Sequence, residues 1–431
     1  MRFISTRGAS PAVGLSDALR AGLAPDGGLY VPQAFPQLAV HDFDGADSLA
    51  AVAERLLAPY FADDALAGVL PAICRDALDL PVPVLALDER TQLLELFHGP
   101  TAAFKDFGAR FLAACLARVR GADEPPITIL VATSGDTGSA VAAAFHRRPG
   151  FRVAILYPEG RVSPRQAHQL GCLGENVHAF RVAGSFDDCQ RLVKLAFADA
   201  ALRERAPLAS ANSISLGRLL PQAAYYAHAA LAHARRGGAP LGFIVPTGNL
   251  GNAFAALMAR AMGLPIGAVH LATNANRTLP DFLAGARYEG RASVATLANA
   301  MDVGDPSNAE RLRWLHPDIG ALRAAVSADT VDDATIAARI REGESRYGQV
   351  WCPHTACAVE VLQRRRAAGD GAPLCVVATA HPAKFEAVVE PLVGHAVPLP
   401  PALAAMLARP ARDEPLAAEY GALRERLLQL P

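Results

Sequence analysis

The chain has 431 residues, with 41 basic and 42 acidic side chains and a formal net charge of −1 at pH 7. Its hydrophobic fraction of 52%, beside 19% charged residues, predicts two or three folded domains and excludes an intrinsically disordered protein. The balanced charge argues against a general nucleic-acid-binding protein or a polybasic membrane protein, and the apolar runs are too short for a transmembrane helix.

Lysine is scarce in this chain, because Lys105, Lys194 and Lys384 are the only lysines among 41 basic residues. The composition therefore favours arginine wherever a cation alone is needed. A lysine that persists against this bias points to amine chemistry, which a guanidinium does not perform.

The seven cysteines are scattered and odd in number, and none stands in a C-x-x-C pair. Cys352 and Cys357 flank His354, but the two further ligands that a zinc site needs are not evident. We therefore expect reduced, mostly buried thiols and no metal. The first residues, 1–8, lack the apolar region of a signal peptide, so the sequence predicts a cytoplasmic protein.

Residues 1–90 are expected to form a separate layer, mainly helical and opened by an extended segment. Residues 17–22 predict a short helix that ends at a glycine, and residues 23–32 predict a turn followed by a short strand. Residues 47–70 have the amphipathic pattern of a helix.

From residue 93 onward, short apolar runs alternate with glycine-rich turns and alanine-rich helices. Such runs are typical of strands that are covered on both faces. They span residues 93–97, 127–131, 153–157, 241–245, 268–271 and 374–378. Repeated strand–turn–helix units predict an α/β fold with a largely parallel sheet, whose ligands lie at the carboxyl ends of the strands.

The rest of the chain predicts less regular structure. Residues 279–346 are expected to be mostly helical, with an irregular insert at 301–308, and the residues from 399 onward predict a proline-broken tail that ends in a helix. The predicted domains are the N-terminal layer of residues 1–90, a large α/β domain of residues 91–125 and 240–431, and a smaller α/β domain of residues 126–239.

The first strand–turn–helix junction carries Lys105. Thr101 is expected to cap the following helix, which places Lys105 in the first turn. A helix N-terminus disfavours a cation, and this field together with burial beside two phenylalanines would lower the pKa of the amine toward nucleophilic use. The alternative is a solvated lysine paired with Asp106. The position of Lys105 in the sequence supports the two interpretations equally, and the scarcity of lysine favours the functional one.

The second junction, residues 129–139, runs from a strand into small, hydroxyl-rich residues that include Ser134 and Thr137. It could bind an anion or a carboxylate, although hydroxyl groups are also common helix caps.

Residues 210–218 place Asn212, Ser213 and Arg218 at the head of a helix. A bidentate phosphate contact would suit Arg218. A solvated arginine is the alternative, and the neighbouring asparagine and serines favour binding.

Residues 242–252 have the features of a phosphate-binding loop, here called the cradle. Gly248 and Gly251 allow close backbone approach, and the following helix offers free N–H groups. Thr247, Asn249 and Asn252 add side-chain donors. The segment lacks the G-K-[ST] ending of a Walker loop and is not a G-x-G-x-x-G fingerprint. A glycine-rich turn that only packs is the alternative, and the asparagines favour binding.

The last strand is followed by Thr379, which by itself would be a helix cap. Lys384 lies close to it in sequence and is the more credible competitor of Lys105, as a charge near the site. Lys194, in the predicted helix of residues 186–198, is expected to be solvated.

Five segments, in this order, resemble the motifs of threonine synthases, above all the subgroup with an extended N-terminal region. They are His98–Gly108, Thr133–Gly138, Asn212–Arg218, Gly248–Asn252 and Thr379–Phe385. Residues 23–32 and 299–308 also resemble that subgroup, so the likeness runs from residue 1 to about residue 390. The resemblance implies the tryptophan-synthase-β-like α/β fold, which is fold type II of pyridoxal-phosphate enzymes, with parallel sheets flanked by helices and an N-terminal extension.

The resemblance also implies roles for the motif residues. Lys105 would hold pyridoxal 5'-phosphate as a Schiff base and then act as base and acid. The cofactor would contact Asp136 near its 3-hydroxyl group, Thr379 at its pyridine nitrogen, and Gly248, Asn249, Leu250, Gly251 and Asn252 at its phosphate. The substrate phosphate would be held by Ser134, Thr137, Asn212, Ser213 and Arg218. Asp136 and Ser215 are departures, since many relatives have asparagine at the first position and subgroup members often have it at the second.

The implied activity is that of a lyase in amino-acid biosynthesis. O-phospho-L-homoserine and water would give L-threonine and orthophosphate by γ-elimination and β-addition of water, the final step of threonine biosynthesis. The expected partner is this small molecule, with no nucleic acid and no membrane, and the expected state is a monomer or homodimer.

Two other classes of function stay open from the sequence. Another fold-type-II enzyme, such as a serine/threonine dehydratase or a β-replacing synthase, would keep the lysine and the cradle but would not need Arg218. A non-catalytic relative that only binds the cofactor or an effector is disfavoured, because the lysine, the cradle and the residues expected to hold the substrate phosphate are all present.

Overall fold

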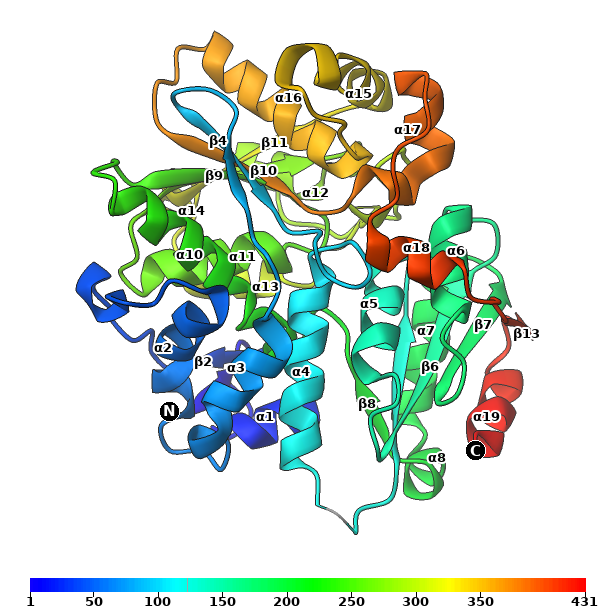
Figure 1. Ribbon diagram of the computed structural model, residues 1–431. Helices are drawn as coiled ribbons and strands as arrows, with labels where there is room; N and C mark the ends of the chain where they lie inside the picture. Colours follow the sequence, from blue (N-terminus) through cyan, green and yellow to red (C-terminus); the bar gives the residue numbers. More distant parts are fainter. Residues whose placement is uncertain (122) are drawn as a thin grey trace.

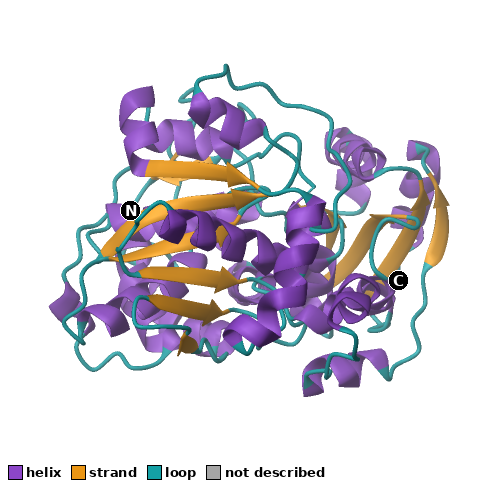
Figure 2. Cartoon of the chain, turned by 90° about the horizontal axis from the view of Figure 1, so that it is seen from above, coloured by secondary structure: helices purple, strands orange, loops and turns teal. Residues whose placement is uncertain are grey.

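The computed structural model describes residues 1–121 and 123–431 of the chain (Figure 1). Helix α4 (Lys105–Val119) lies at the centre of the view in Figure 1, and Figure 2 shows two separate sheets flanked by helices. This arrangement confirms the predicted α/β fold with parallel sheets and an N-terminal extension.

The larger sheet has six strands in the order β11-β10-β9-β12-β4-β3, and all its neighbours pair in parallel except β3 with β4. Its strands are β3 (Val84–Ala86), β4 (Thr91–Glu95), β9 (Leu241–Pro246), β10 (Ile266–Thr273), β11 (Val326–Thr330) and β12 (Leu374–Ala378). Strands β9 and β12 are buried along their whole length, which explains their uninterrupted apolar sequences.

The smaller sheet has five parallel strands in the order β13-β7-β6-β5-β8. Its strands are β5 (Ile127–Ala132), β6 (Phe151–Pro158), β7 (Val177–Ala183), β8 (Leu208–Ser210) and β13 (Glu414–Ala417). A separate antiparallel pair, β1 (Phe3–Ser5) and β2 (Tyr30–Pro32), belongs to the N-terminal layer.

Apart from α4, the helices fall into three groups. The N-terminal layer contains α1 (Leu15–Ala21), α2 (Leu49–Phe61) and α3 (Leu70–Leu78), with 3₁₀ turns at Val40–Phe43 and Ala67–Val69. With the smaller sheet go α5 (Asp136–Phe145), α6 (Pro164–Gly171), α7 (Phe186–Ala198), α8 (Ala200–Arg205), α18 (Pro401–Leu407) and α19 (Tyr420–Gln429).

The remaining helices surround the larger sheet. They are α9 (Leu216–Leu219), α10 (Gln222–Ala234), α11 (Gly251–Ala261), α12 (Thr278–Ala284), α13 (Ala309–Leu315), α14 (Ile319–Ala325), α15 (Asp333–Tyr347), α16 (Pro353–Ala367) and α17 (Glu386–Val393), with 3₁₀ turns at Asn299–Met301 and Pro382–Phe385.

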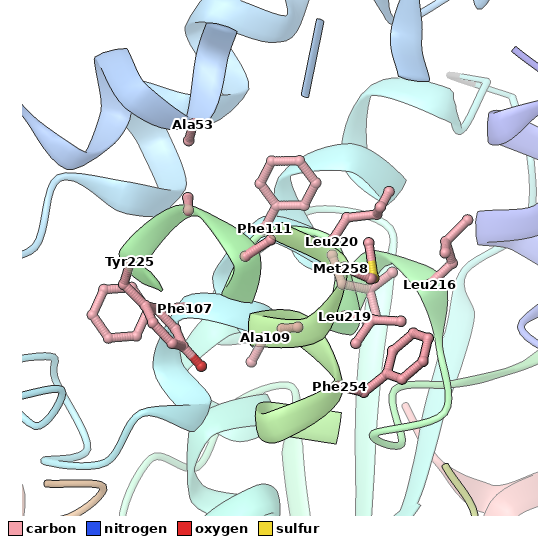
Figure 3. Packing of buried hydrophobic residues seen from close by; sticks show 14 of the residues in the cluster. Ala53, Phe107, Ala109, Phe111, Leu216, Leu219, Leu220, Tyr225, Phe254 and Met258 are labelled. Atoms are coloured by element: carbon pink, nitrogen blue, oxygen red, sulfur yellow. The ribbon is translucent and has the colours of Figure 1, made fainter. Parts of the chain in front are cut away.

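An apolar cluster behind the strand ends joins α4, α9, α10 and α11 (Figure 3). Phe107 of α4 meets Tyr225 of α10 edge to face, with ring centroids 5.4 Å apart. Leu219, Phe254 and Met258 belong to the same fully buried cluster. Because these side chains are closely packed, the first turns of α4, α9 and α11 are fixed relative to one another.

The six predicted apolar runs are confirmed as β4, β5, β6, β9, β10 and β12. The sequence missed β3, β7, β8, β11 and β13, of which β3 and β8 have only three residues and β11 and β13 are not apolar runs. The predicted helix at 47–70 is split in two, with a 3₁₀ turn between α2 and α3.

The predicted domain boundaries stay a prediction. The structure adds that β13, which the sequence placed in the large domain, pairs with β7 of the smaller sheet. No helix among the described residues is both long and apolar enough to cross a membrane. All seven cysteines are free and buried.

Candidate active site

A cavity of about 320 Å³ lies where the carboxyl ends of strands from both sheets meet. Its walls come from the start of α4, from α7, and from the segments that follow β5, β8, β9 and β12. Every site residue predicted from the sequence lines it, namely Lys105, Ser134, Asp136, Thr137, Asn212, Ser213, Arg218, Gly248, Asn249, Leu250, Gly251, Asn252 and Thr379. Parallel strands explain this convergence, because their carboxyl ends share one edge of each sheet.

Lys105 is the first residue of α4, so its side chain projects from the helix start into the cavity. The predicted cap by Thr101 is wrong: the backbone N–H and hydroxyl of Thr101 instead donate to the Asp106 carboxylate at 2.9 and 2.7 Å. Asp106 is buried and occupied by Thr101, so it is not the partner that the solvated alternative required for Lys105. That local fold turns the amine toward the cavity.

The Lys105 amine has no carboxylate within 4 Å among the described residues, and it lies over the Phe104 ring, 5.5 Å from the centroid. Burial lowers the pKa of Lys105 to about 8, while the charge of Asp136 opposes this shift and the charges of Arg218 and Lys384 add to it. At pH 7 about a tenth of such an amine is uncharged, far more than for an ordinary lysine, which suits a nucleophile or base.

Asp136 is held by a buried ion pair with Lys384. The Lys384 ammonium lies 2.8 Å from Asp136 Oδ1 and also donates to the carbonyl oxygen of Thr101 at 2.7 Å. Gln166 Nε2 donates to the same carboxylate oxygen at 3.0 Å. Burial alone would raise the pKa of Asp136, but the charges of Lys384 and Lys105 outweigh it and hold this pKa well below its usual range.

This ion pair settles two points that the sequence left open. Asp136 is ionised at neutral pH, and Lys384 is fully buried and engaged with Asp136 rather than facing the cavity. Lys384 is therefore a charge behind the site, and of these two lysines Lys105 is the one whose side chain lines the cavity.

The segment after β9 forms a cradle at the start of α11. Leu250 adopts a left-handed backbone conformation with φ of 66°, an unusual state for leucine that brings Gly251 to the head of the helix. A Cβ atom on Gly248 would lie 2.6 Å from the Cα atom of Met301, so no larger residue fits there. The backbone N–H groups at this helix start suit an anion.

Two asparagines of the cradle have different partners. Asn249 Nδ2 donates to Ser213 Oγ, and Asn249 Oδ1 accepts from the Ser307 N–H at 2.6 Å, so this side chain links the cradle to the 213 segment. Asn252 Oδ1 accepts from the hydroxyl groups of two tyrosines, Tyr225 and Tyr226. Its Nδ2 atom is buried without a partner among the described residues, which leaves a donor for a ligand.

Arg218 is a buried cation without a carboxylate partner. The side chain is 1% exposed, and no Asp or Glu oxygen among the described residues lies within 4 Å of it. Its Nη1 atom donates to the Ala211 carbonyl, whereas Nε has no partner. Gly108 permits its approach, because a Cβ there would lie 2.6 Å from the Arg218 carbonyl oxygen. Burial lowers the pKa of Arg218 to about 10, so an anion in the cavity would be favoured.

The segment after β5 presents two hydroxyl groups to the cavity, those of Ser134 and Thr137. Thr133 folds this segment, since its Oγ1 atom accepts from the N–H groups of Gly135 and Gly138 at 3.0 and 2.9 Å. Ser134 and Thr137 then stand at the start of α5 beside Asp136.

His354 lines the cavity, although the sequence suggested only a discarded zinc ligand for it. It lies in the first turn of α16, and its Nε2 atom accepts from the Ala300 N–H at 3.2 Å. Burial lowers the pKa of His354 to about 4, so the imidazole is neutral at physiological pH. Only the tertiary contact between α16 and the 299–301 turn could have revealed it.

The face of α7 that lines the cavity was also missed. Phe186, Gln190, Val193 and Lys194 belong to this face. The expectation that Lys194 is solvated is confirmed in that the residue is exposed, but its exposure is at the cavity. The scarcity of lysine was the one sequence signal that could have found it.

Arg311 connects the N-terminal layer to the cavity wall. It is fully buried and donates to the Tyr30 carbonyl of β2 at 3.1 and 2.9 Å, to the Ile214 carbonyl at 2.7 Å and to Asn308 Oδ1 at 2.6 Å. Asn308 in turn donates to the carbonyl of Asn249 at 2.9 Å. Through these hydrogen bonds the N-terminal layer supports both the cradle and the segment that carries Ser213.

Comparison with known protein families gives matches along most of the chain. Residues 87–380 match the family described as pyridoxal-phosphate dependent enzyme. Residues 2–78 match threonine synthase N terminus, and residues 355–426 match threonine synthase, C-terminal.

Individual relatives agree with the family matches. A threonine synthase of Serratia marcescens is 39% identical over 440 residues, covering 100% of both chains. The crystal structure of threonine synthase from Escherichia coli superposes with a TM-score of 0.91 at 37% identity, covering 99% of each chain. The structure of a threonine synthase from Brucella melitensis with bound pyridoxal phosphate has a TM-score of 0.90, also at 37% identity and 99% coverage.

Proposed function

Because the chain belongs to the threonine synthase family of pyridoxal-phosphate-dependent enzymes, we propose that it converts O-phospho-L-homoserine and water to L-threonine and orthophosphate in the cavity described above. Threonine synthase activity, a lyase reaction, and pyridoxal phosphate as cofactor follow from family membership. The identity of the substrate and the role of each residue are the proposed part.

The cavity fits the cofactor. The cradle at the start of α11 offers backbone N–H groups and the unpartnered Asn252 Nδ2 atom to its phosphate. Lys105 offers an amine with a lowered pKa for covalent attachment. Thr379, 4% exposed at the end of β12, offers a neutral hydroxyl group to the pyridine nitrogen, and Asp136 offers an ionised carboxylate near the 3-hydroxyl group.

The observation that carries the choice of substrate is the buried, unpaired guanidinium of Arg218. A desolvated cation with a free N–H donor is costly unless an anion completes it. The phosphate of the substrate would do so, with Asn212, Ser213, Ser134 and Thr137 lining the same cavity. A dehydratase or β-replacing synthase, whose substrate has no phosphate, gives no reason for a cation at this place.

The chemistry of the step divides between cofactor and protein. Pyridoxal phosphate, when bound, draws electrons from the amino acid and so acidifies its carbon-bound protons. The Lys105 amine, with its pKa of about 8, would accept the protons lost from Cα and Cβ and return protons at Cγ and Cα, so that Cγ becomes the methyl group of threonine. Arg218 and the hydroxyl groups hold the phosphate and neutralise the charge that grows on it as the Cγ–O bond breaks. Water then adds at Cβ, which gives the hydroxyl group of threonine.

The direct test supplies the purified holoenzyme with O-phospho-L-homoserine and measures both products. We expect L-threonine and orthophosphate in equal amounts, and no orthophosphate from the variant K105A. Formation of a keto acid from L-threonine without phosphate release would instead show a dehydratase. A protein that binds the cofactor but yields neither product would be the non-catalytic relative.

Two further expectations, on cellular location and on oligomeric state, complete the proposal. A cytoplasmic location agrees with seven cysteines that are free and buried. A monomer or homodimer is proposed for the assembly, and sedimentation of the purified protein measures it.

A further inference from the structure

Lys194 stands in the cavity wall with no assigned role. It belongs to α7, and its exposed side chain lines the cavity together with Phe186, Gln190 and Val193. The spacing of these four residues, at i, i+4, i+7 and i+8, puts them on one face of the helix. Asp187 and Arg191 of the same helix are exposed, Asp188 is half-buried, and none of the three lines the cavity.

The ammonium group of Lys194 lacks an anionic partner. No carboxylate oxygen among the described residues lies within 4 Å of it, and it makes no hydrogen bond to them. By contrast Arg191, three residues earlier, forms an ion pair with Asp188 at 3.1 Å. A long, flexible cation that faces a cavity rather than a surface carboxylate is available to a ligand.

The charge balance of the cavity shows what such a ligand needs. Asp136 is neutralised by Lys384, and the proposed function assigns Lys105 to the cofactor. Arg218 and Lys194 then remain as positive side chains of the lining without carboxylate partners. Asp305 is the other acidic residue of the lining, and its Oδ1 atom accepts from the Tyr288 hydroxyl at 2.9 Å.

We propose that Lys194 is a second cation for the phosphate group of the substrate, acting from α7 at the open side of the cavity while Arg218 acts from its buried side. This inference rests on the proposed function, since it takes the phosphorylated amino acid as the ligand. A phosphate dianion carries two negative charges, whereas the Arg218 guanidinium supplies one positive charge and the neighbouring hydroxyl and amide groups supply none. A mobile ammonium suits the outer oxygens, because the same group can release orthophosphate after the reaction.

The test compares the holoenzyme with variants K194M, K194R and, as a matched control on the same helix, R191M. We expect K194M to raise the KM for O-phospho-L-homoserine and the inhibition constant of inorganic phosphate by roughly fivefold to tenfold, the range for one partly exposed charge contact. K194R should recover most of this loss, and R191M should behave as the native enzyme. In roughly 1 M salt, where the Debye length is only ~3 Å, the effect of K194M should shrink.

A second ligand distinguishes the phosphate from the carboxylate of the substrate. L-threonine carries a carboxylate but no phosphate, and its binding can be followed by the absorbance of the bound cofactor. If Lys194 contacts the phosphate group, the K194M variant should bind L-threonine as tightly as the native enzyme does. An equal loss of affinity for L-threonine and inorganic phosphate would overturn the proposal.

Two further outcomes separate this proposal from its rivals. If D305N reproduces the loss seen in K194M, then Lys194 acts by closing the cavity against Asp305 and the assignment to phosphate is wrong. If R218M weakens phosphate binding and K194M does not, the inference about Lys194 fails while the proposed function stands. If the native holoenzyme releases no phosphate from the substrate but phosphate binding, measured by calorimetry, still depends on Lys194, the proposed function fails instead.

Discussion

Replacing Lys384 by methionine removes the ammonium group that lies 2.8 Å from Asp136 Oδ1 and keeps an unbranched apolar side chain in the same buried place. Asp136 retains the hydrogen bond from Gln166 at 3.0 Å but loses its ion-pair partner. We expect the variant to unfold at lower denaturant concentration and to hold the cofactor with an altered pH dependence of its absorbance.

The distance sets the size of the effect. Two unit charges 2.8 Å apart attract by about 6 kcal/mol at an effective dielectric constant of ~20. Removing one partner of a buried pair commonly costs about 3–5 kcal/mol, because the other charge is left desolvated. Both side chains are nearly fully buried, at 0% and 4% exposure, so solvent screening does not reduce this value much.

The pH dependence has a definite sign. In the native protein the pKa of Asp136 is lowered, so its ionisation stabilises the fold above the unfolded-state pKa of about 3.9 and this contribution is lost as the pH falls through the folded-state value. In K384M the charge of Lys384 no longer opposes the effect of burial, so the pKa of Asp136 is higher than in the native protein. The variant therefore regains stability by protonation as the pH falls, and the difference from the native protein narrows on acidification.

The assay is chemical denaturation of the native holoenzyme, K384M, D136N and the double variant, each at saturating cofactor. We expect the double variant to be at least about 2 kcal/mol more stable than the sum of the single losses predicts, because removing both charges leaves neither uncompensated. Single losses that add within about 0.5 kcal/mol, or a K384M loss below about 1 kcal/mol, would refute the reasoning.

Three further expectations follow from the cavity. R218M should lower kcat/KM for O-phospho-L-homoserine by about 10²- to 10³-fold through loss of the buried cation, with R218K recovering part of it; a loss below tenfold in steady-state kinetics would contradict the phosphate assignment. G248A should weaken cofactor binding and cost roughly 1–3 kcal/mol in denaturation, because its Cβ would lie 2.6 Å from the Cα atom of Met301; unchanged cofactor affinity would show that the backbone yields there. The rate at which the apoprotein takes up pyridoxal phosphate should rise with pH through a midpoint near the Lys105 pKa of about 8, since the unprotonated amine reacts; a midpoint above 10 would show that burial does not activate this lysine.

The sequence predicted the order of the site-bearing strands and turns well, because these segments obey local rules. Buried parallel strands need apolar runs, and the residues that follow them need small or hydrogen-bonding side chains. For this reason Lys105, the segment after β5 and the cradle at 248–252 were identified, and the structure gathers them in one cavity. Strands β11 and β13 escaped prediction since neither is a buried apolar run and both lie at sheet edges.

Local rules also misled at one point. A threonine four residues before Lys105 is a reasonable helix cap by sequence, yet the acceptor is the Asp106 carboxylate and Thr101 is the donor. The choice between the two depends on burial of Asp106, which no short stretch of sequence reports.

By itself the sequence determined the fold class, the lysine proposed to carry the chemistry and the glycine-rich cradle, since each depends on residues close together in the chain. The tertiary structure alone decided the electrostatics of the site. Lys384 and Asp136 are 248 positions apart, and their ion pair at 2.8 Å fixes the charge of Asp136. In the same way Lys194 faces the cavity because of how α7 packs on β5 and β6. A charge acts through distance in space and through its loss of water, and neither is set until the chain has folded.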